Sequence, residues 1–156
     1  TMKTHVNATF TLSLKSVVGL TDALGRDQLH NGECSLTIHE KIAELNLVYT
    51  ADLIILDGMN CFVTKGPSEG KRACPGVVIA GGDRVAVDAV GVAILSQFNA
   101  DNITNRRIRD HKQLHWGDYI GLGTLDPNRI EIRSSNPAND PDFPVLLNNI
   151  HRDLSA

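Results

Sequence analysis

Hydrophobic and hydroxyl residues alternate along residues 8–14, which read ATFTLSL. A period of two predicts a half-buried strand that carries Thr9, Thr11 and Ser13 on one face. If the extended backbone continues in both directions, the side chains of His5 and Lys15 project from that same face. The pattern therefore predicts a polar, hydrogen-bonding wall in this part of the chain.

Two short aliphatic runs, LIIL at 53–56 and VVIA at 77–80, predict strands that are covered on both faces. The first run is closed by Asp57, which places this carboxylate at the end of a strand. Two glycines and Asp83 follow the second run, and we expect Asp83 to cap a helix that extends to about residue 98. This helix is apolar on nearly every side, so it should be largely buried.

The remaining segments are less regular. A helix is expected over 35–48, opened by a capping box of Thr37 and Glu40, and a basic helix over 102–114. Residues 19–33 have the composition of a loop. The C-terminal part is expected to hold an edge strand and a last helix, at 130–133 and 145–154.

Strands that alternate with helices indicate an α/β fold, with a mixed, mainly parallel sheet flanked by helices. We expect a single domain over residues 1–156, in which residues 134–156 form a C-terminal extension. Ligands of such sheets usually bind beyond the carboxyl ends of the strands.

The composition narrows the function classes. The 156 residues are 42% hydrophobic and 21% charged, which is typical of a folded domain and excludes disorder. A net charge of −3 argues against nucleic acid or a membrane surface as a partner, even though Arg106, Arg107 and Arg109 are clustered. Three cysteines without a CxxC motif indicate neither a disulfide framework nor a zinc or iron–sulfur site, and they favour the reducing cytoplasm.

Cationic side chains are concentrated in the first thirty residues, among the hydroxyl residues of the predicted strand. They belong to Lys3, His5, Lys15, Arg26 and His30. Such a group can hold a carboxylate or phosphate, or place a histidine for proton transfer near its ordinary pKa of about 6.5. The alternative is an exposed sheet face with ordinary polar residues.

Two further features are candidates for chemistry. The segment GPSEGKR at 66–72 has three residues between Gly66 and Gly70, whereas a phosphate-binding loop of nucleotide-binding proteins has four. Its backbone N–H groups can still bind an anion, and a plain turn is the alternative.

Asp88 is an ionisable residue in an apolar helix, so it needs a partner, either as a catalytic group or as a satisfied core carboxylate.

The other four histidines are assigned to solvated helix faces. His111 and His115 have the spacing of one side of a metal site, but a third ligand is missing from the pattern. The same interpretation applies to His39 and His151.

These motifs occur in an order that resembles the DUF362 family of uncharacterised proteins, over residues 1 to about 133. The shared features are the KTH of residues 3–5, the run from Thr11 to Lys15 followed by Gly19, the residues Arg26 and His30, Asp57-Gly58, Gly66-Pro67 with Gly70, and GDRVAVDAVG at 82–91. Ser16 stands where the family usually has asparagine. The resemblance implies the C-terminal part of a longer architecture, whose preceding segment would complete a shared site. Some relatives carry ferredoxin-like cysteine clusters, and because this chain has none, we expect no iron–sulfur cluster.

The order and spacing of His5, Lys15 and His30 are also similar to the lactate racemase family. This resemblance implies that His5 is the acid/base, that Lys15 tethers a nickel-pincer nucleotide and that His30 binds the nickel. The implied cofactor is a divalent metal or a nickel-pincer group.

The sequence thus predicts a pocket for a small anionic or metal-bearing ligand, with His5, Lys15 and Asp88 as catalytic residues and His30 as metal ligand. If the protein is an enzyme, we expect acid/base chemistry on a small carboxylate or phosphorylated metabolite. The alternative is a non-catalytic binding or assembly module, in which the same residues form structural ion pairs and the chain forms a homo-oligomer. The predicted substrate-binding residues are Lys3, Thr11, Ser13, Arg26, Asp57, Gly66, Gly70 and Asp83.

Overall fold

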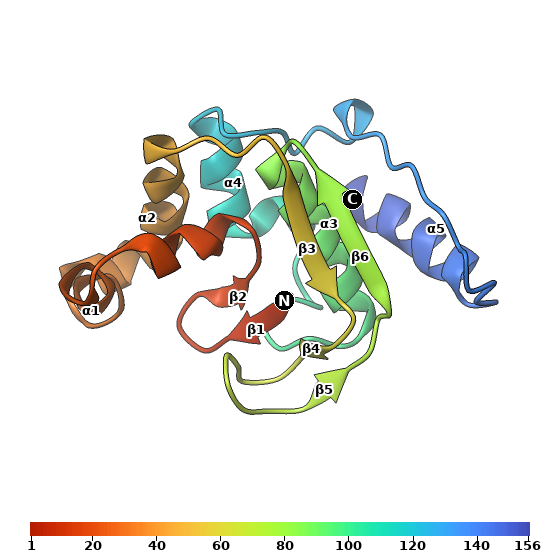
Figure 1. The fold of residues 1–156 in the computed structure, drawn as a ribbon, viewed down its shortest axis with the longest axis horizontal. Helices are drawn as coiled ribbons and strands as arrows, with labels where there is room; N and C mark the ends of the chain where they lie inside the picture. The colour runs from red at the N-terminus through yellow and green to blue at the C-terminus, as the bar shows by residue number, and fades with distance from the viewer.

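A long central helix organises the protein. The computed structural model describes the backbone of residues 1–156 and all side chains except those of residues 33 and 34. Helix α3 (Arg84–Gln97) lies behind a ribbon of two strands, β3 (Ile54–Gly58) and β6 (Val77–Gly81) (Figure 1). Helices α2 and α4 flank α3 on one side and α5 on the other, as Figure 1 also shows.

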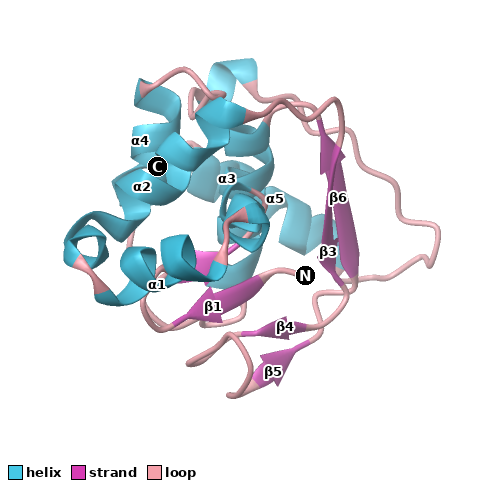
Figure 2. Cartoon of the chain, turned by 60° about the vertical axis from the view of Figure 1, so that its left-hand side comes forward, coloured by secondary structure: helices cyan, strands magenta, loops and turns pink.

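A second sheet, made of four short strands, lies at one end of the ribbon, where Figure 2 shows its strands below β3 and β6. Its strand order is β2-β1-β4-β5, and β1 and β2 form an antiparallel hairpin. The class is therefore α/β, as predicted. The two long strands are antiparallel, however, and the parallel pairing described between β1 and β4 is the single register Lys3 with Phe62. The bounds of the short strands are Lys3–His5 for β1, Thr9–Thr11 for β2, Cys61–Phe62 for β4 and Arg72–Ala73 for β5.

The ribbon of β3 and β6 is covered on one face only. Leu56 of β3 is buried against the core, whereas Ile55 and Val78 are 67% and 62% exposed. The prediction that both strands are covered on both faces is wrong. An aliphatic run without alternation has no polar face to indicate which side meets water, and here α3 packs against one side of the ribbon.

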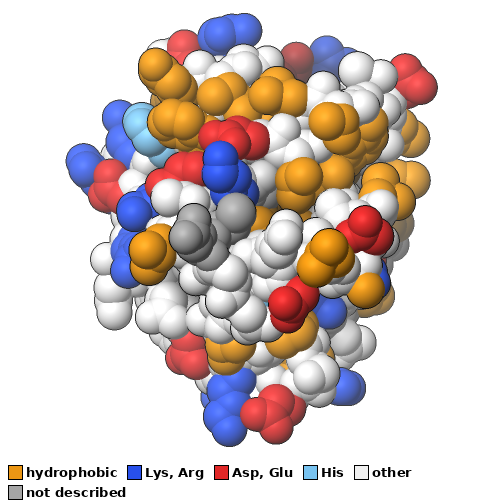
Figure 3. Space-filling model, turned by 90° about the vertical axis from the view of Figure 1, so that its left-hand side faces the viewer, with side chains coloured by type: hydrophobic (Ala, Val, Ile, Leu, Met, Phe, Trp, Pro, Cys, Tyr) orange, Lys and Arg blue, Asp and Glu red, His pale blue; other side chains and the backbone are white. Residues whose placement is uncertain are grey.

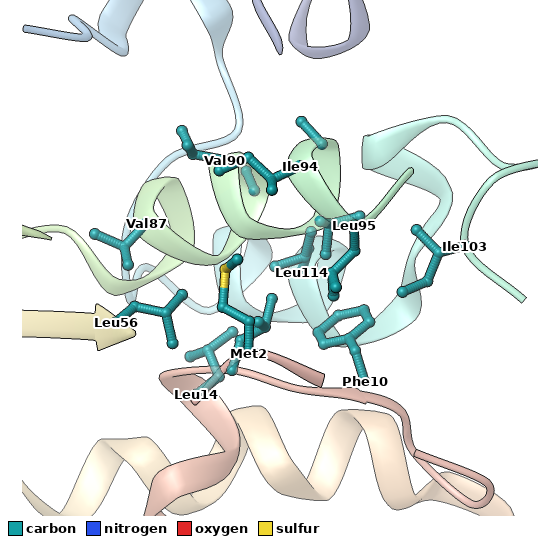
Figure 4. Close-up of a cluster of buried hydrophobic side chains, with 14 of the residues drawn as sticks. Met2, Phe10, Leu14, Leu56, Val87, Val90, Ile94, Leu95, Ile103 and Leu114 are labelled. Atoms are coloured by element: carbon teal, nitrogen blue, oxygen red, sulfur yellow. The ribbon is translucent and has the colours of Figure 1, made fainter. Parts of the chain in front are cut away.

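Helix α3 confirms its prediction. Its N-cap Asp83 accepts hydrogen bonds from the backbone N–H groups of Val85 (2.9 Å) and Ala86 (2.8 Å). Eleven of its fourteen residues are buried, and Figure 4 shows Val87 and Leu95 on the side of Leu56 and Phe10, whereas Val90 and Ile94 point to the opposite side of the helix. Met2, Phe10, Leu14 and Leu56 belong to the same buried cluster and come from the N-terminal segment and β3.

The first half of the chain contains a helix where a loop was predicted. Helix α1 (Ala23–Asn31) begins at Asp22, whose Oδ1 accepts the N–H of Gly25 at 2.7 Å. Leu29 is the one buried residue of α1, so the sequence carries no apolar stripe that would reveal a helix. The helix expected over 35–48 is α2 (Ile38–Glu44), flanked by the 3-10 helices η2 (Glu33–Thr37) and η3 (Leu45–Val48). The capping box is wrong, because the Thr37 side chain makes no cap hydrogen bond.

The C-terminal part differs in its boundaries. The basic helix expected over 102–114 is absent: the 3-10 helix η4 (Ile108–Asp110) precedes helix α4 (Lys112–Tyr119), and residues 101–105 form turns. The backbone at 130–133, beyond the 3-10 helix η5 (Pro127–Arg129), is irregular rather than an edge strand. Helix α5 (Phe143–Leu154) forms as predicted, and it packs on α3 with Ile150 and Leu154 buried. None of the described helices is both long enough and apolar enough to span a bilayer.

Candidate anion-binding site

The position of Lys15 is set by a buried carboxylate. Strand β2 ends at Thr11, and Asp88 of α3 accepts the backbone N–H groups of Ser13 (2.7 Å) and Leu14 (2.9 Å). These bonds fix the start of the 3-10 helix η1 (Leu14–Leu20), which carries Lys15. The predicted continuous strand from His5 to Lys15 is therefore wrong, because a turn after His5 and a helix after Ser13 interrupt it.

The structure nevertheless brings four of the predicted cationic side chains together. Strand β1 contributes Lys3 and His5, η1 contributes Lys15, and α1 contributes His30, which we call the cationic cluster. The rings of His5 and His30 lie 5.8 Å apart between centroids. This contact joins two residues that are 25 positions apart in sequence.

Burial and mutual repulsion dominate the electrostatics of the cationic cluster. Lys15 is only 8% exposed, and burial followed by the charge of Lys3 lowers the pKa of its amine. Burial also lowers the pKa of His5 to about 4, with smaller contributions from Lys15, His30 and Lys3. No ion pair joins a described carboxylate to any of the four side chains. The cluster therefore presents positive charge that the described part of the protein leaves uncompensated.

The two histidines of the cluster have opposite proton arrangements. The N–H groups of Asn7 and Ala8 donate to Nδ1 of His5, at 3.2 and 3.3 Å, so the neutral ring of His5 carries its proton on Nε2. Nδ1 of His30 lies 2.9 Å from the carbonyl oxygen of Arg26, which can only accept, so this nitrogen is protonated. Neutral His30 therefore has its lone pair on Nε2. His5 is a hydrogen-bond donor at neutral pH, and His30 is the better placed base.

Behind the cluster, the carboxylate of Asp88 belongs to a buried network that sequence reasoning missed. Asn46 donates to the carbonyl oxygens of Leu14 (2.8 Å) and Ile42 (2.7 Å), and its own amide oxygen accepts from Arg84 (3.0 Å). The guanidinium of Arg84 also stacks on Tyr49, 4.6 Å from the ring centroid. Asp88 is fully buried, and desolvation raises its pKa to about 7. The network supports the backbone that carries Lys15, and a sequence offers no signal that joins residues 46, 84 and 88.

Several predicted ligand-binding residues have structural partners elsewhere. Arg26 is exposed on α1 and joins the site only through its carbonyl oxygen. The side chain of Asp57 accepts from Thr1 (2.9 Å) and the N–H of Met59 (2.9 Å), and these bonds hold the pKa of its carboxyl below the usual value. Asp83 uses its second oxygen to accept the N–H of Thr124 at 2.9 Å, in addition to capping α3.

The remaining predicted contacts lie in the hairpin and in the loop after β4. The hydroxyl of Ser13 donates to the carbonyl oxygen of Arg84 (3.3 Å), and that of Thr11 is buried without a hydrogen-bond partner among the described atoms. Gly66 and Gly70 have φ of +66° and +127°. A Cβ on either glycine would lie about 2 Å from a carbonyl oxygen, that of Thr4 or Thr64 respectively. Their conformation fits a turn packed on β1, which accounts for both glycines without a ligand.

The cationic cluster does not fit a free divalent metal. Among the described His, Cys, Asp and Glu side chains, no group of three is arranged to hold a metal ion. In the cluster, the one bare imidazole nitrogen is Nε2 of His30, and the ammonium groups of Lys3 and Lys15 would repel a dication. The nickel-pincer group, with Lys15 as its tether, stays a prediction.

The buried histidines predict a loss of stability in acid. His5 and His111 have pKa values of about 4 in the fold against about 6.5 when unfolded, so their stabilising effect is complete above pH 6.5. As the pH falls from 6.5 to 4, the unfolded chain takes up two more protons than the folded one at these rings. Asp88 has the opposite effect on stability between pH 7 and 4, because the folded state holds one proton on this carboxyl that the unfolded state has lost. We therefore expect the free energy of unfolding in urea to fall over this range.

In the variant His5→Gln the free energy of unfolding should depend less steeply on pH than in the wild type. Only one histidine then takes up a proton on unfolding, and the proton of Asp88 offsets it. His151, which is exposed on α5, provides the matched control His151→Gln, and this variant should keep the wild-type profile. A His5→Gln profile as steep as that of the wild type would contradict the burial of a neutral His5.

Comparison with known proteins gives one match. The family model described as domain of unknown function (DUF362) matches residues 1–93. This range includes all four residues of the cationic cluster and Asp88, and it ends within α3. No curated protein and no solved structure matches the chain.

Proposed function

The chain belongs to the DUF362 family, a domain of unknown function, and we propose that its cationic cluster binds a small carboxylate or phosphorylated metabolite. The observation that supports this most strongly is the burial of Lys15 without a carboxylate partner among the described residues. Taking an ammonium group out of water costs several kcal/mol unless a counter-charge compensates it. An anionic ligand would provide that counter-charge.

Each member of the cluster has a distinct role in this proposal. Lys15 is the principal anchor for the anion, and Lys3, which is half-buried, adds the second positive charge. His5 donates a hydrogen bond from Nε2–H without adding charge, because it is neutral at pH 7. If the ligand undergoes acid/base chemistry, His30 accepts the proton at Nε2 and returns it, and Asp88 acts only by positioning η1.

Calorimetric titration with inorganic phosphate and with citrate tests the proposal. The wild type should bind at least one of these probes at the cationic cluster, and this component of the binding isotherm should be at least tenfold weaker in Lys15→Gln. Lys65 is the matched control, since its exposed ammonium group lies 3.7 Å from Glu69, so Lys65→Gln should bind like the wild type. The absence of binding to both anions, or equal binding by Lys15→Gln, would overturn the proposal.

An assembly module is the second candidate, and exposed apolar side chains favour it. Figure 3 shows hydrophobic side chains over the face that carries α1 and α2. Large side chains more than half exposed on η1, α1, η2 and η3 are those of Leu20, Leu24, Leu36, Leu47 and Val48. Sedimentation velocity on the same samples tests this candidate, because assembly requires an oligomer. We also propose that the protein is located in the cytoplasm. The free thiols of Cys61 and Cys74 are compatible with this location.

A further inference from the structure

A second polar site lies between the hairpin and the start of α4, on residues that the proposed function does not use. A cavity of about 80 Å³ is lined by Thr9 and Phe10 of β2, His39 of α2, and Arg106, His111 and Gln113. One buried water needs a cavity of roughly 15 Å³, so this cavity is several times larger than a single water requires. Thus it has room for a small polar molecule.

Two buried polar side chains line this cavity with atoms that have no hydrogen-bond partner among the described atoms. Gln113 is completely buried, and neither its Nε2 nor its Oε1 has a hydrogen bond among the described atoms. His111 is 2% exposed, and its Nε2 is also unpaired. Leaving such groups unsatisfied costs about 1–3 kcal/mol each, so three unpaired atoms beside one cavity indicate an occupant that hydrogen-bonds to them.

The charges around the cavity favour an anion as this occupant. Arg106 is exposed and takes part in no ion pair with a described carboxylate, and Lys112 lies at the cavity with its Nζ 4.0 Å from Glu40. Burial and Arg106 keep His111 neutral by lowering its pKa to about 4, so its ring contributes a hydrogen bond and no charge. The guanidinium of Arg106 and the loosely paired ammonium of Lys112 therefore give the cavity a positive net charge.

The backbone adds to this preference. Helix α4 begins at the cavity, and no described side chain caps its N-terminus at His111. The first N–H groups of a helix are free donors, and together with the helix dipole they attract anions. Lys112 and Gln113 are the first two residues of α4, and both line the cavity.

We infer that this cavity is a binding site for hydrogen phosphate, either free or as the phosphate group of a phosphomonoester whose monoanionic form keeps one O–H. Hydrogen phosphate carries both acceptor oxygens and one O–H donor. Its oxygens accept from Arg106, from the Gln113 amide and from the start of α4, while its O–H donates to Oε1 of Gln113. Sulfate lacks this donor and would leave Oε1 unpaired, so the site should discriminate between the two anions. Arg106 also lines a wider hollow of about 430 Å³ along residues 99–105, where the rest of a phosphomonoester would extend.

Amide chemical shifts in NMR test this inference, because they separate this site from the cationic cluster. On titration with inorganic phosphate, the amide signals of Lys112 and Gln113 should shift saturably, and sulfate should bind at least tenfold more weakly. The shifts should persist in Lys15→Gln. They should weaken at least tenfold in Arg106→Gln, whereas the exposed neighbour Arg109 gives the matched control Arg109→Gln, which should bind like the wild type. Titration with glycerol phosphate then distinguishes a free anion from a phosphomonoester by additional shifts along residues 99–105.

Several results would overturn the inference. One is the absence of saturable shifts at Lys112 and Gln113, which would mean that water fills the cavity. Another is equal affinity for sulfate and phosphate, and a third is unchanged binding in Arg106→Gln. Because Arg106 is exposed, its replacement leaves the fold intact, so the test needs no substitution of the buried Gln113.

Discussion

Replacement of Asp88 by alanine is expected to lower the free energy of unfolding by about 3 kcal/mol, a decrease of roughly 9 °C in Tm for a chain of this size. The carboxylate accepts the N–H groups of Ser13 and Leu14, and Leu14 is completely buried, so water cannot replace both lost bonds. Relief of the desolvated charge offsets part of the loss. Its pKa of about 7 indicates that the fold already disfavours the ionised form.

Urea denaturation at pH 7 measures this effect. Asp88→Asn keeps one acceptor oxygen and should lose about half as much stability as Asp88→Ala, and the exposed α1 residue Asp27 provides the control Asp27→Ala. A loss below about 1 kcal/mol in Asp88→Ala would contradict the role of Asp88 as the anchor of η1. Loss of anion binding in a fully stable Asp88→Asn would instead assign this carboxylate to the ligand.

Replacement of Lys15 by methionine is expected to stabilise the protein while abolishing binding at the cationic cluster. Methionine fills the same volume without a desolvated charge, and a gain of about 1–2 kcal/mol corresponds to a rise of roughly 3–6 °C in Tm. The sign follows from the lowered pKa of the Lys15 amine. A lowered pKa means that the fold disfavours the charged form, so replacing the amine relieves this penalty.

Thermal unfolding followed by circular dichroism, with and without inorganic phosphate, measures both effects. Phosphate bound at the cluster should raise the Tm of the wild type more than that of Lys15→Met. Lys65→Met is the control with no expected change. A lower Tm for Lys15→Met without any anion would instead mean that Lys15 has a structural partner, as the assembly hypothesis requires.

The sequence by itself determined the elements whose patterns are local. Asp83 caps α3 because an acidic residue before an apolar helical run satisfies free N–H groups, whatever the rest of the fold does. The same holds for β3 and β6, whose aliphatic runs stand between turn residues. The ordered motifs also identified the family, and the density of cationic side chains in residues 3–30 identified four members of one cluster.

Only the tertiary structure decided how these elements meet. The antiparallel pairing of β3 with β6 depends on their connection through β4 and β5. Hydrophobic periodicity carries no information on strand direction or on such a connection. Helix α1 lacks an apolar stripe and is therefore invisible to periodicity, yet it brings His30 to His5 and excludes Arg26. The polar neighbours of His111 in the sequence predict a surface position, but the side chain is buried, and Phe10, 101 residues earlier, packs against its ring. Burial, and with it the direction of every pKa shift at both sites, depends on contacts between distant segments, and no local pattern encodes such contacts.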